Sequence, residues 1–243
     1  MKELHIFQKG FNYSQDGPGN RLVYHLSGCS LRCPWCANPE GKPHSGGEVV
    51  SLSSILQEAI SCKPMFFENG GVTFTGGEAT EQFDALKELL QQLKAESIST
   101  CIETNCTHPR LPELFSLIDY LIVDCKHYDD SKHQKIIGCS NRTILQNIAL
   151  ACTQRNQLAI RIPLIGGFNT TVEDARGFSE TFRNIGATQI ATVELLRYHE
   201  YGKDKYTALG LPYTMTQEAH ITDEVYQQFA NALTQSGVRL ISS

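Results

Sequence analysis

The sequence predicts an α/β protein whose parallel strands are joined by crossover helices. Short β-rich runs alternate with amphipathic segments about six times before a closing strand, a pattern typical of parallel sheets. With 243 residues, of which 41% are hydrophobic and 19% charged, the chain can bury one sizeable core and is not predominantly disordered. A barrel or part-barrel fits this alternation better than an open sheet, although a doubly wound sheet alternates in the same way. We expect one domain over residues 1–243.

Each element is predicted from its own local pattern. Seven runs read as strands, at 21–27, 71–75, 99–103, 119–124, 158–163, 190–196 and 238–241. Apolar residues recur at helical spacing in five segments, at 52–60, 83–93, 144–151, 172–182 and 221–229. Ser51 and Thr80 are predicted as helix N-caps.

Charge and hydropathy exclude several functional classes. The formal net charge of −5 does not favour nucleic acid as a partner. No apolar run approaches the roughly 18 to 20 residues that a membrane span needs, and the first ten residues lack the apolar core of a signal peptide. We therefore expect a cytoplasmic protein with neither a nucleic-acid nor a membrane partner. Nine cysteines in a reducing compartment point to a metal or redox site more than to disulfides.

Three of these cysteines lie close together in a loop over residues 28–47, directly after the first predicted strand. Cys29, Cys33 and Cys36 have the spacing C-x3-C-x2-C. Thiolates hold iron-sulfur clusters, and such clusters usually take four protein ligands. Three ligands would leave one iron open to a substrate or cofactor, as in catalytic metal sites. The spacing therefore favours an iron that takes part in chemistry.

Two other interpretations of this loop stay open at this point. The three thiols could hold a structural zinc with His25 or His44 as the fourth ligand, or they could hold no metal. Most of the remaining cysteines are predicted as buried core thiols. They lie at positions 62, 101, 106, 125, 139 and 152.

Polar residues follow successive predicted strands. They are Gly76, Gly77 and Glu78; Glu103, Thr104 and Asn105; Asp124 and Lys126; Arg161; and Arg197 and His199. Any one of them is readily explained as a polar group at a strand end. In a parallel barrel, however, these strand ends open on one face, which is the face that carries active sites. Carboxylates, cations and a histidine beside an open cluster would suit a zwitterionic ligand with a base and a sugar.

A further candidate precedes the first predicted strand. Residues 16–19 read Asp-Gly-Pro-Gly, the composition of a turn. A solvent-exposed turn is one interpretation. Alternatively, a rigid turn could place Asp16 against a macromolecular substrate.

Together these residues resemble the radical S-adenosylmethionine superfamily and, within it, the glycyl radical enzyme activating enzymes. The motif C-x3-C-x2-C followed by Gly-Gly-Glu is typical of the superfamily. The turn at 16–19 and the segments 103–105, 124–126 and 194–206 resemble the activating enzymes. Only 39 residues separate Cys36 from Gly76, so the chain is similar to pyruvate formate-lyase activase, which lacks the ferredoxin-like insert of longer members.

The resemblance implies a partial (β/α)6 TIM-like barrel with its active site at the carboxyl ends of the strands. Cys29, Cys33 and Cys36 would ligate a [4Fe-4S] cluster whose fourth iron binds S-adenosylmethionine. Reductive cleavage would give a 5'-deoxyadenosyl radical that abstracts hydrogen from a glycine of a partner enzyme. The implied cofactor-binding residues are Trp35, Cys36, Ala37, Gly76, Gly77, Glu78, Asp124, Cys125, Lys126, Arg161 and His199.

The resemblance also implies partners and further sites. The protein substrate would be a glycyl radical enzyme, contacted by Asp16, and the electron donor a flavodoxin or ferredoxin; the family suggests a monomer. Glu103 and Thr104 stand where the family has a monovalent cation site, with glutamate in place of aspartate. Two other functions stay open: a small-molecule radical enzyme such as a 7-carboxy-7-deazaguanine synthase, and a non-enzymatic zinc or iron-sulfur module.

Overall fold

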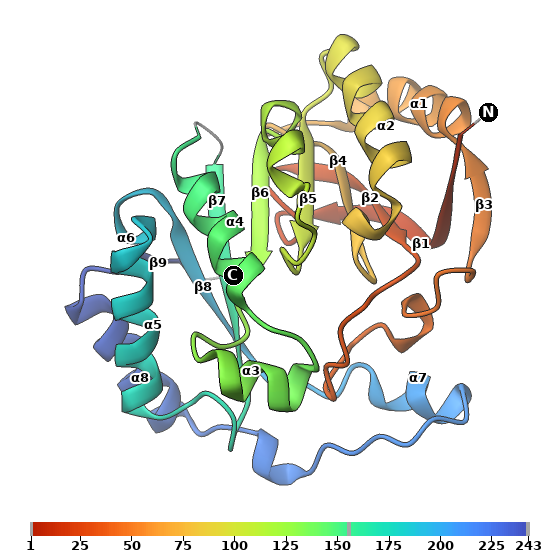
Figure 1. The fold of residues 1–243 in the computed structure, drawn as a ribbon. Coiled ribbons are helices and arrows are strands. Elements are labelled where there is room, and N and C mark those ends of the chain that lie inside the picture. Colours follow the sequence, from red (N-terminus) through yellow and green to blue (C-terminus); the bar gives the residue numbers. More distant parts are fainter. Residues whose placement is uncertain (1, 155–156, 242–243) are drawn as a thin grey trace. The chain divides into compact units, whose positions relative to one another are not determined.

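The computed structural model describes residues 2–154 and 157–241 and contains two compact units (Figure 1). The first unit comprises the chain up to Ser30, Asn38–Thr104 and Arg110–Ile122. The second comprises Leu31–Ala37, Asn105–Pro109 and the chain from Val123. Of the three motif cysteines, one therefore belongs to the first unit and two to the second. The expectation of a single domain over residues 1–243 stays a prediction.

Five strands form the sheet of the first unit. They are β1 (Glu3–Tyr13), β2 (Asn20–Leu26), β3 (Glu48–Ser51), β4 (Gly71–Gly76) and β5 (Thr100–Thr104), in the spatial order β3-β1-β2-β4-β5. Strands β2, β4 and β5 are parallel, whereas β1 is antiparallel to both of its neighbours. The helices of this unit are α1 (Leu52–Ser61) and α2 (Phe83–Ala95), with 3-10 turns at Pro39–Gly41, Lys63–Met65, Ala79–Gln82 and Leu111–Leu117. A further strand, β6 (Tyr120–Asp124), begins in the first unit and ends in the second.

The two faces of the parallel strands in the first unit differ in chemistry. Tyr24, Phe74 and Ile102 lie side by side on one face, where they are buried beneath α1 and α2 (Figure 1). The Tyr24 hydroxyl donates a hydrogen bond to Glu58 of α1, which fixes this face as the helix side. Because successive side chains of a strand point to opposite faces, the intervening residues lie on the other side. We call this side the polar face; it carries Arg21, Thr73, Thr75, Cys101 and Glu103.

The second unit contains three strands that run parallel in the order β7-β8-β9. They are β7 (Gln157–Leu164), β8 (Thr192–Arg197) and β9 (Leu240–Ile241). Its helices are α3 (Asp130–Ile137), α4 (Arg142–Cys152), α5 (Val172–Asn184), α6 (Ala187–Ile190), α7 (Lys203–Ala208) and α8 (Asp223–Gln235), with a 3-10 turn at Gln217–Ala219. Helices α5 and α8 lie side by side and meet through Phe178 and Phe229 (Figure 1). No helix in the described part of the chain is long and apolar enough to cross a membrane.

The α/β class and all seven predicted strands are confirmed, with corrections at two places. Residue 190 ends α6 instead of opening a strand, because Gly186 in left-handed conformation starts a helical turn just before it. Thr80 does not cap α2, which begins at Phe83; its hydroxyl and backbone amide bind Glu78 instead. Ser51 does cap α1, accepting from the amide of Ser54.

Strands β1 and β3 were not predicted from the sequence. Strand β1 is largely polar and exposed in its second half, and β3 has only four residues, none of them buried. The apolar alternation of β1 is limited to Leu4 and Ile6, and β3 is too short to show one.

Two phenylalanines of the first unit differ in burial, so we expect their replacement by alanine to have very different effects on stability. Phe74 is fully buried under the helices, and its replacement by alanine leaves a cavity. We expect Phe74→Ala to lower the free energy of unfolding by about 3–5 kcal/mol. Phe67→Ala is the matched control, because this ring is 54% exposed, and its effect should stay within about 0.5 kcal/mol. Urea denaturation measures both, and equal losses would contradict the assignment of the core.

Candidate active site

In the first unit, the Gly-Gly-Glu segment packs directly on the residue that precedes the first cysteine. The amide of Gly77 donates to Leu26 O over 2.9 Å, and the amide of Glu78 donates to Gly28 O over 2.6 Å. Gly28 in turn donates to Gly41 O over 2.8 Å. A Cβ at position 77 would collide with the carbonyl oxygens of Gly28 and Gly41, so only glycine fits this crossing. Three backbone segments therefore meet at the base of the cysteine loop.

Glu78 links the ends of two parallel strands. Its side chain is buried, and its Oε1 accepts hydrogen bonds from the Thr80 amide (3.0 Å), the Thr80 hydroxyl (2.5 Å) and the Thr104 hydroxyl (2.7 Å). Thr104 is the last residue of β5, whereas Glu78 follows β4. The carboxylate is thereby oriented before any ligand arrives.

The predicted cation residues point to opposite faces of β5. Thr104 is buried toward Glu78, whereas Glu103 is half-buried on the polar face, where Oε2 accepts from the Thr75 hydroxyl over 3.4 Å. Their side chains are therefore not brought together, although they are sequence neighbours.

Asp16 lies in a turn that packs against the polar face. The Thr73 hydroxyl donates to Asp16 O over 2.7 Å, and the side-chain amide of Asn12 donates to Asp16 Oδ2. Residues 16–18 are half-buried and Gly19 is buried. The turn is therefore partly exposed, and the contact of Asp16 with a macromolecular substrate stays a prediction.

In the second unit, the other two cysteines lie in a tight turn. The Cys36 amide donates to Cys33 O over 3.3 Å. Gly202, which begins α7 as its N-cap, packs so closely on this turn that a Cβ there would collide with Cys36 O and approach Ala37. The segment after β8 and the cysteine turn are thus in direct backbone contact.

Trp35 joins an aromatic cluster beside that turn. Its ring lies 5.3 Å from the ring of Phe168, centroid to centroid. Both rings pack against the buried residues Ile165, Tyr198 and Ala219. Since Tyr198 directly precedes His199, the structure brings two predicted cofactor-binding positions into one neighbourhood.

The predicted charged residues of the second unit form two ion pairs. Lys126 Nζ lies 2.7 Å from Asp124 Oδ2, and Arg161 Nε donates to Glu194 Oε2 over 2.7 Å. The amide of Cys125 donates to Arg161 O over 2.9 Å, which connects the two positions through the backbone. Burial raises the pKa of the Cys125 thiol to about 12, so this thiol stays protonated at neutral pH.

His199 is neutral at pH 7, because burial lowers its pKa. Its Nδ1 accepts from the Tyr201 amide over 3.3 Å, and the two rings stack with centroids 3.9 Å apart. Nε2 therefore carries the ring proton and is a hydrogen-bond donor.

Of the other cysteines, Cys101, Cys106 and Cys125 are buried, as predicted for core thiols, whereas those at 62, 139 and 152 are half-buried. All nine cysteines are described, and no disulfide joins any two of them. Over residues 2–154 and 157–241, no three His, Cys, Asp or Glu side chains meet as a group that could hold a metal ion. The ligand role of the three motif cysteines stays a prediction.

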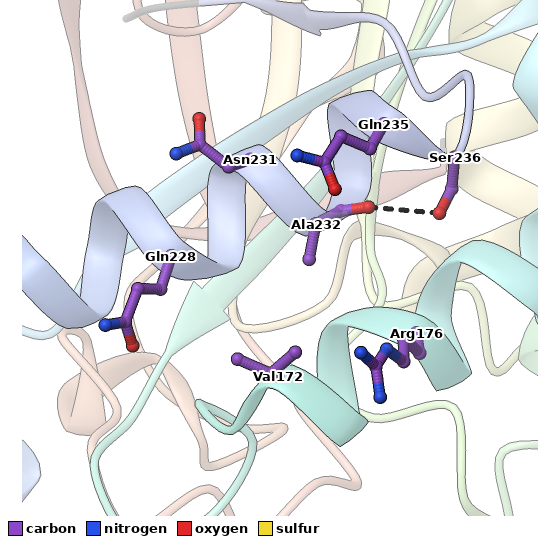
Figure 2. Close-up of a pocket in the computed structure, with 7 residues that line it drawn as sticks. All are labelled: Val172, Arg176, Gln228, Asn231, Ala232, Gln235 and Ser236. Carbon is purple, nitrogen blue, oxygen red and sulfur yellow. Dashed lines mark hydrogen bonds between the residues drawn. The ribbon is translucent and has the colours of Figure 1, made fainter.

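A pocket between α5 and α8 is a different site (Figure 2). Figure 2 shows polar side chains along α8, and Ser236 donates a hydrogen bond to Ala232 O of the same helix. The residues that line the pocket are Val172, Arg176, Gln228, Asn231, Ala232, Gln235 and Ser236, none of which is a predicted site residue.

Three residues that organise the site were not singled out from the sequence. Glu194 pairs with Arg161, and Arg21 binds the turn that contains Asp16. Asn169 is fully buried and joins the strand ends, donating to Lys126 O (2.9 Å) and Pro163 O (2.8 Å). Each contact spans a long sequence separation or a loop, so no local residue spacing predicts it.

Comparison of the chain with known protein families and relatives agrees with this geometry. The radical SAM superfamily model matches residues 23–177. The chain is 29% identical over 231 residues to the pyruvate formate-lyase 1-activating enzyme of Escherichia coli K12, covering 93% of each chain. It is 31% identical over 223 residues to the pyruvate formate-lyase-activating enzyme of Staphylococcus epidermidis, covering 88% of each.

A solved domain of pyruvate-formate lyase-activating enzyme from Bacteroides vulgatus matches 72% of this chain and 99% of its own length. Its TM-score is 0.57 and its sequence identity 25%. This likeness agrees with the predicted α/β fold and with the partial barrel of radical SAM proteins. The chain belongs to the radical SAM superfamily and, within it, to the glycyl radical enzyme activating enzymes.

Proposed function

We propose that this enzyme uses a [4Fe-4S] cluster and S-adenosylmethionine to place a radical on a glycine of a partner glycyl radical enzyme. Membership of the family implies both the cluster and the cofactor. The observation that carries the proposal is the backbone crossing of Gly77 on Gly28, which joins the Gly-Gly-Glu segment to the base of the cysteine loop. A small-molecule radical enzyme is less supported, because the relatives that match most of the chain are activating enzymes.

The thiols of Cys29, Cys33 and Cys36 would hold the cluster. Sulfur ligands are what iron-sulfur clusters require, so the donor set fits. When bound, the reduced cluster supplies the electron that cleaves S-adenosylmethionine to methionine and a 5'-deoxyadenosyl radical. The chain's own contribution is to hold the two cysteine segments, one through Gly28 and Gly77 and the other through Gly202.

The cofactor contacts divide by chemistry. Glu78, already oriented by three donors, would accept from the methionyl amino group beside the backbone of Gly76 and Gly77. The ring of Trp35, with Ala37, would lie against the adenine. The remaining proposed contacts come from Cys36, Asp124, Cys125, Lys126, Arg161 and His199. Neutral His199 would donate from Nε2, consistent with its occupied Nδ1.

A monovalent cation would bind at the end of β5. Because Glu103 and Thr104 point to opposite faces, the two side chains would not both serve as ligands. The Glu103 carboxylate and the backbone carbonyl of Thr104 would supply oxygen donors. Oxygen donors of this kind suit hard cations.

The partner would meet the turn at Asp16, and a flavodoxin or ferredoxin would supply the electron. We propose a monomer, as the family suggests. We propose the cytoplasm as the location, because a cysteine-rich chain with an iron-sulfur motif suits a reducing compartment.

Replacing a motif cysteine tests the cluster assignment. We expect Cys33→Ala, after anaerobic reconstitution with iron and sulfide, to bind less iron per chain and to form no 5'-deoxyadenosine with dithionite, because the cluster loses a thiolate. Cys62→Ala is the control, since this half-buried thiol lies outside the motif. Full 5'-deoxyadenosine formation by Cys33→Ala would refute the assignment.

The close approach of Gly202 gives a second test. Gly202→Ala should displace the turn that contains Cys36 and lower the rate of 5'-deoxyadenosine formation by about tenfold to a hundredfold, because reacting groups tolerate little displacement. Gly10→Ala is the matched control, because a Cβ there meets no atom within 4 Å. The cluster's electron paramagnetic resonance spectrum should change only in the first variant; identical spectra and rates would contradict this role.

A substitution at Asp16 tests whether this residue acts in radical transfer and not in cofactor cleavage. Asp16→Asn keeps the size of the side chain but removes its charge, and a lost charged hydrogen bond corresponds to roughly a tenfold effect or more. We expect 5'-deoxyadenosine formation without partner to be unchanged and the yield of glycyl radical to fall. A glycyl radical enzyme from the same organism serves as the partner in this assay. An unchanged radical signal would exclude the role of Asp16.

A further inference from the structure

Arg21 is the only arginine among the fully buried side chains of the described chain, and it lies at the start of β2. All five N–H donors of its guanidinium group are used. The acceptors are Thr73 Oγ1 (2.6 Å) for Nε, Pro18 O (3.3 Å) and Asn69 O (3.2 Å) for Nη1, and Val72 O (2.8 Å) and Ser99 O (3.1 Å) for Nη2. None of these five acceptors is a carboxylate. The cation is therefore stabilised by a shell of neutral oxygens, four of them backbone carbonyls.

The Thr73 hydroxyl connects Arg21 to the turn at residues 16–19. A guanidinium group can only donate, so the Thr73 hydroxyl accepts from Arg21 and must use its own proton elsewhere. That proton goes to Asp16 O over 2.7 Å. Arg21, Thr73 and the backbone of Asp16 thus form one directed chain of hydrogen bonds.

The turn also rests on the arginine side chain itself. A Cβ at Gly17, where φ is +110°, would lie 3.0 Å from Arg21 Cδ and 3.1 Å from Cys101 Sγ. Nη1 of the same arginine binds Pro18 O. Residues 16–18 are therefore fixed at two carbonyl oxygens, Asp16 O by Thr73 and Pro18 O by Arg21, and along one face by the Arg21 side chain.

We propose that Arg21 and Thr73 are positioning residues that hold the turn at residues 16–19 in the conformation in which Asp16 meets the protein partner. This inference rests on the proposed function of Asp16. Burying a cation is costly, and an apolar residue often fills such a position with no loss of stability. A role in fixing the turn gives a reason for the buried charge.

A purely structural role is the competing explanation, because Arg21 also binds Asn69, Val72 and Ser99. Substitution of Arg21 itself would disturb all these contacts and risks loss of folding. Thr73 separates the two explanations, since it contacts the turn without binding the other segments through its hydroxyl. Thr73→Val removes the hydroxyl and keeps the shape, whereas Thr73→Ser keeps the hydroxyl and is the matched control.

The kinetic test uses the reconstituted full chain with a glycyl radical enzyme from the same organism. We expect Thr73→Val to raise KM for the partner about tenfold, with kcat and partner-independent 5'-deoxyadenosine formation within twofold of the wild type. Thr73→Ser should match the wild type in all three. An unchanged KM in Thr73→Val overturns the proposal, as does an equal KM increase in both variants.

A second readout does not require the partner. Hydrogen exchange measured by mass spectrometry should be faster over residues 14–20 in Thr73→Val than in Thr73→Ser, with exchange in α5 unchanged. Equal exchange over 14–20 in the two variants overturns the proposal even where no partner is activated. A third outcome is that the wild type forms no glycyl radical while exchange differs between the variants as expected. In that case the stabilisation of the turn at residues 16–19 by Thr73 is supported, and the proposed function is contradicted.

Discussion

The alternation of side chains along β2, β4 and β5 is the constraint on which the site in the first unit depends. Because α1 and α2 cover the face that contains Tyr24 and Phe74, side chains that alternate with these two along the strands lie on the opposite face. That face holds Arg21 and Thr73 near the amino end of the parallel strands and Thr75 with Glu103 near the carboxyl end. One surface thus connects the turn of Asp16 to the strand ends that lead into the Gly-Gly-Glu segment.

Glycine contacts hold the two cysteine-bearing segments. Gly77 lies against Gly28, one residue before the first cysteine, and Gly202 lies against Cys36. In both places backbone packs on backbone, so no side chain is available to adjust if the spacing changes. Such contacts restrict the ligand segments more tightly than surface side chains would, which suits a site whose reacting groups need fixed positions.

The sequence was informative where the signal is local. Periodicity identified the seven strands, and residue spacing identified the cysteine and Gly-Gly-Glu motifs. It failed for β1, which is mostly exposed after Ile6, for β3, which has only four residues, and for Thr80, whose hydroxyl binds Glu78. It also could not find the partners of Arg21 or the pairing of Arg161 with Glu194, 33 residues apart. Those contacts depend on strand register, which is set by the complete sheet and not by neighbouring residues.

The buried charges of the two units are stabilised in different ways. Lys126 and Arg161 each face a carboxylate, so their charges are already paired and oriented within the protein. Arg21, by contrast, has used all its donors on neutral oxygens of its own unit and has none left for a ligand. Its charge therefore acts on the protein's own backbone, which is the arrangement that a positioning residue requires.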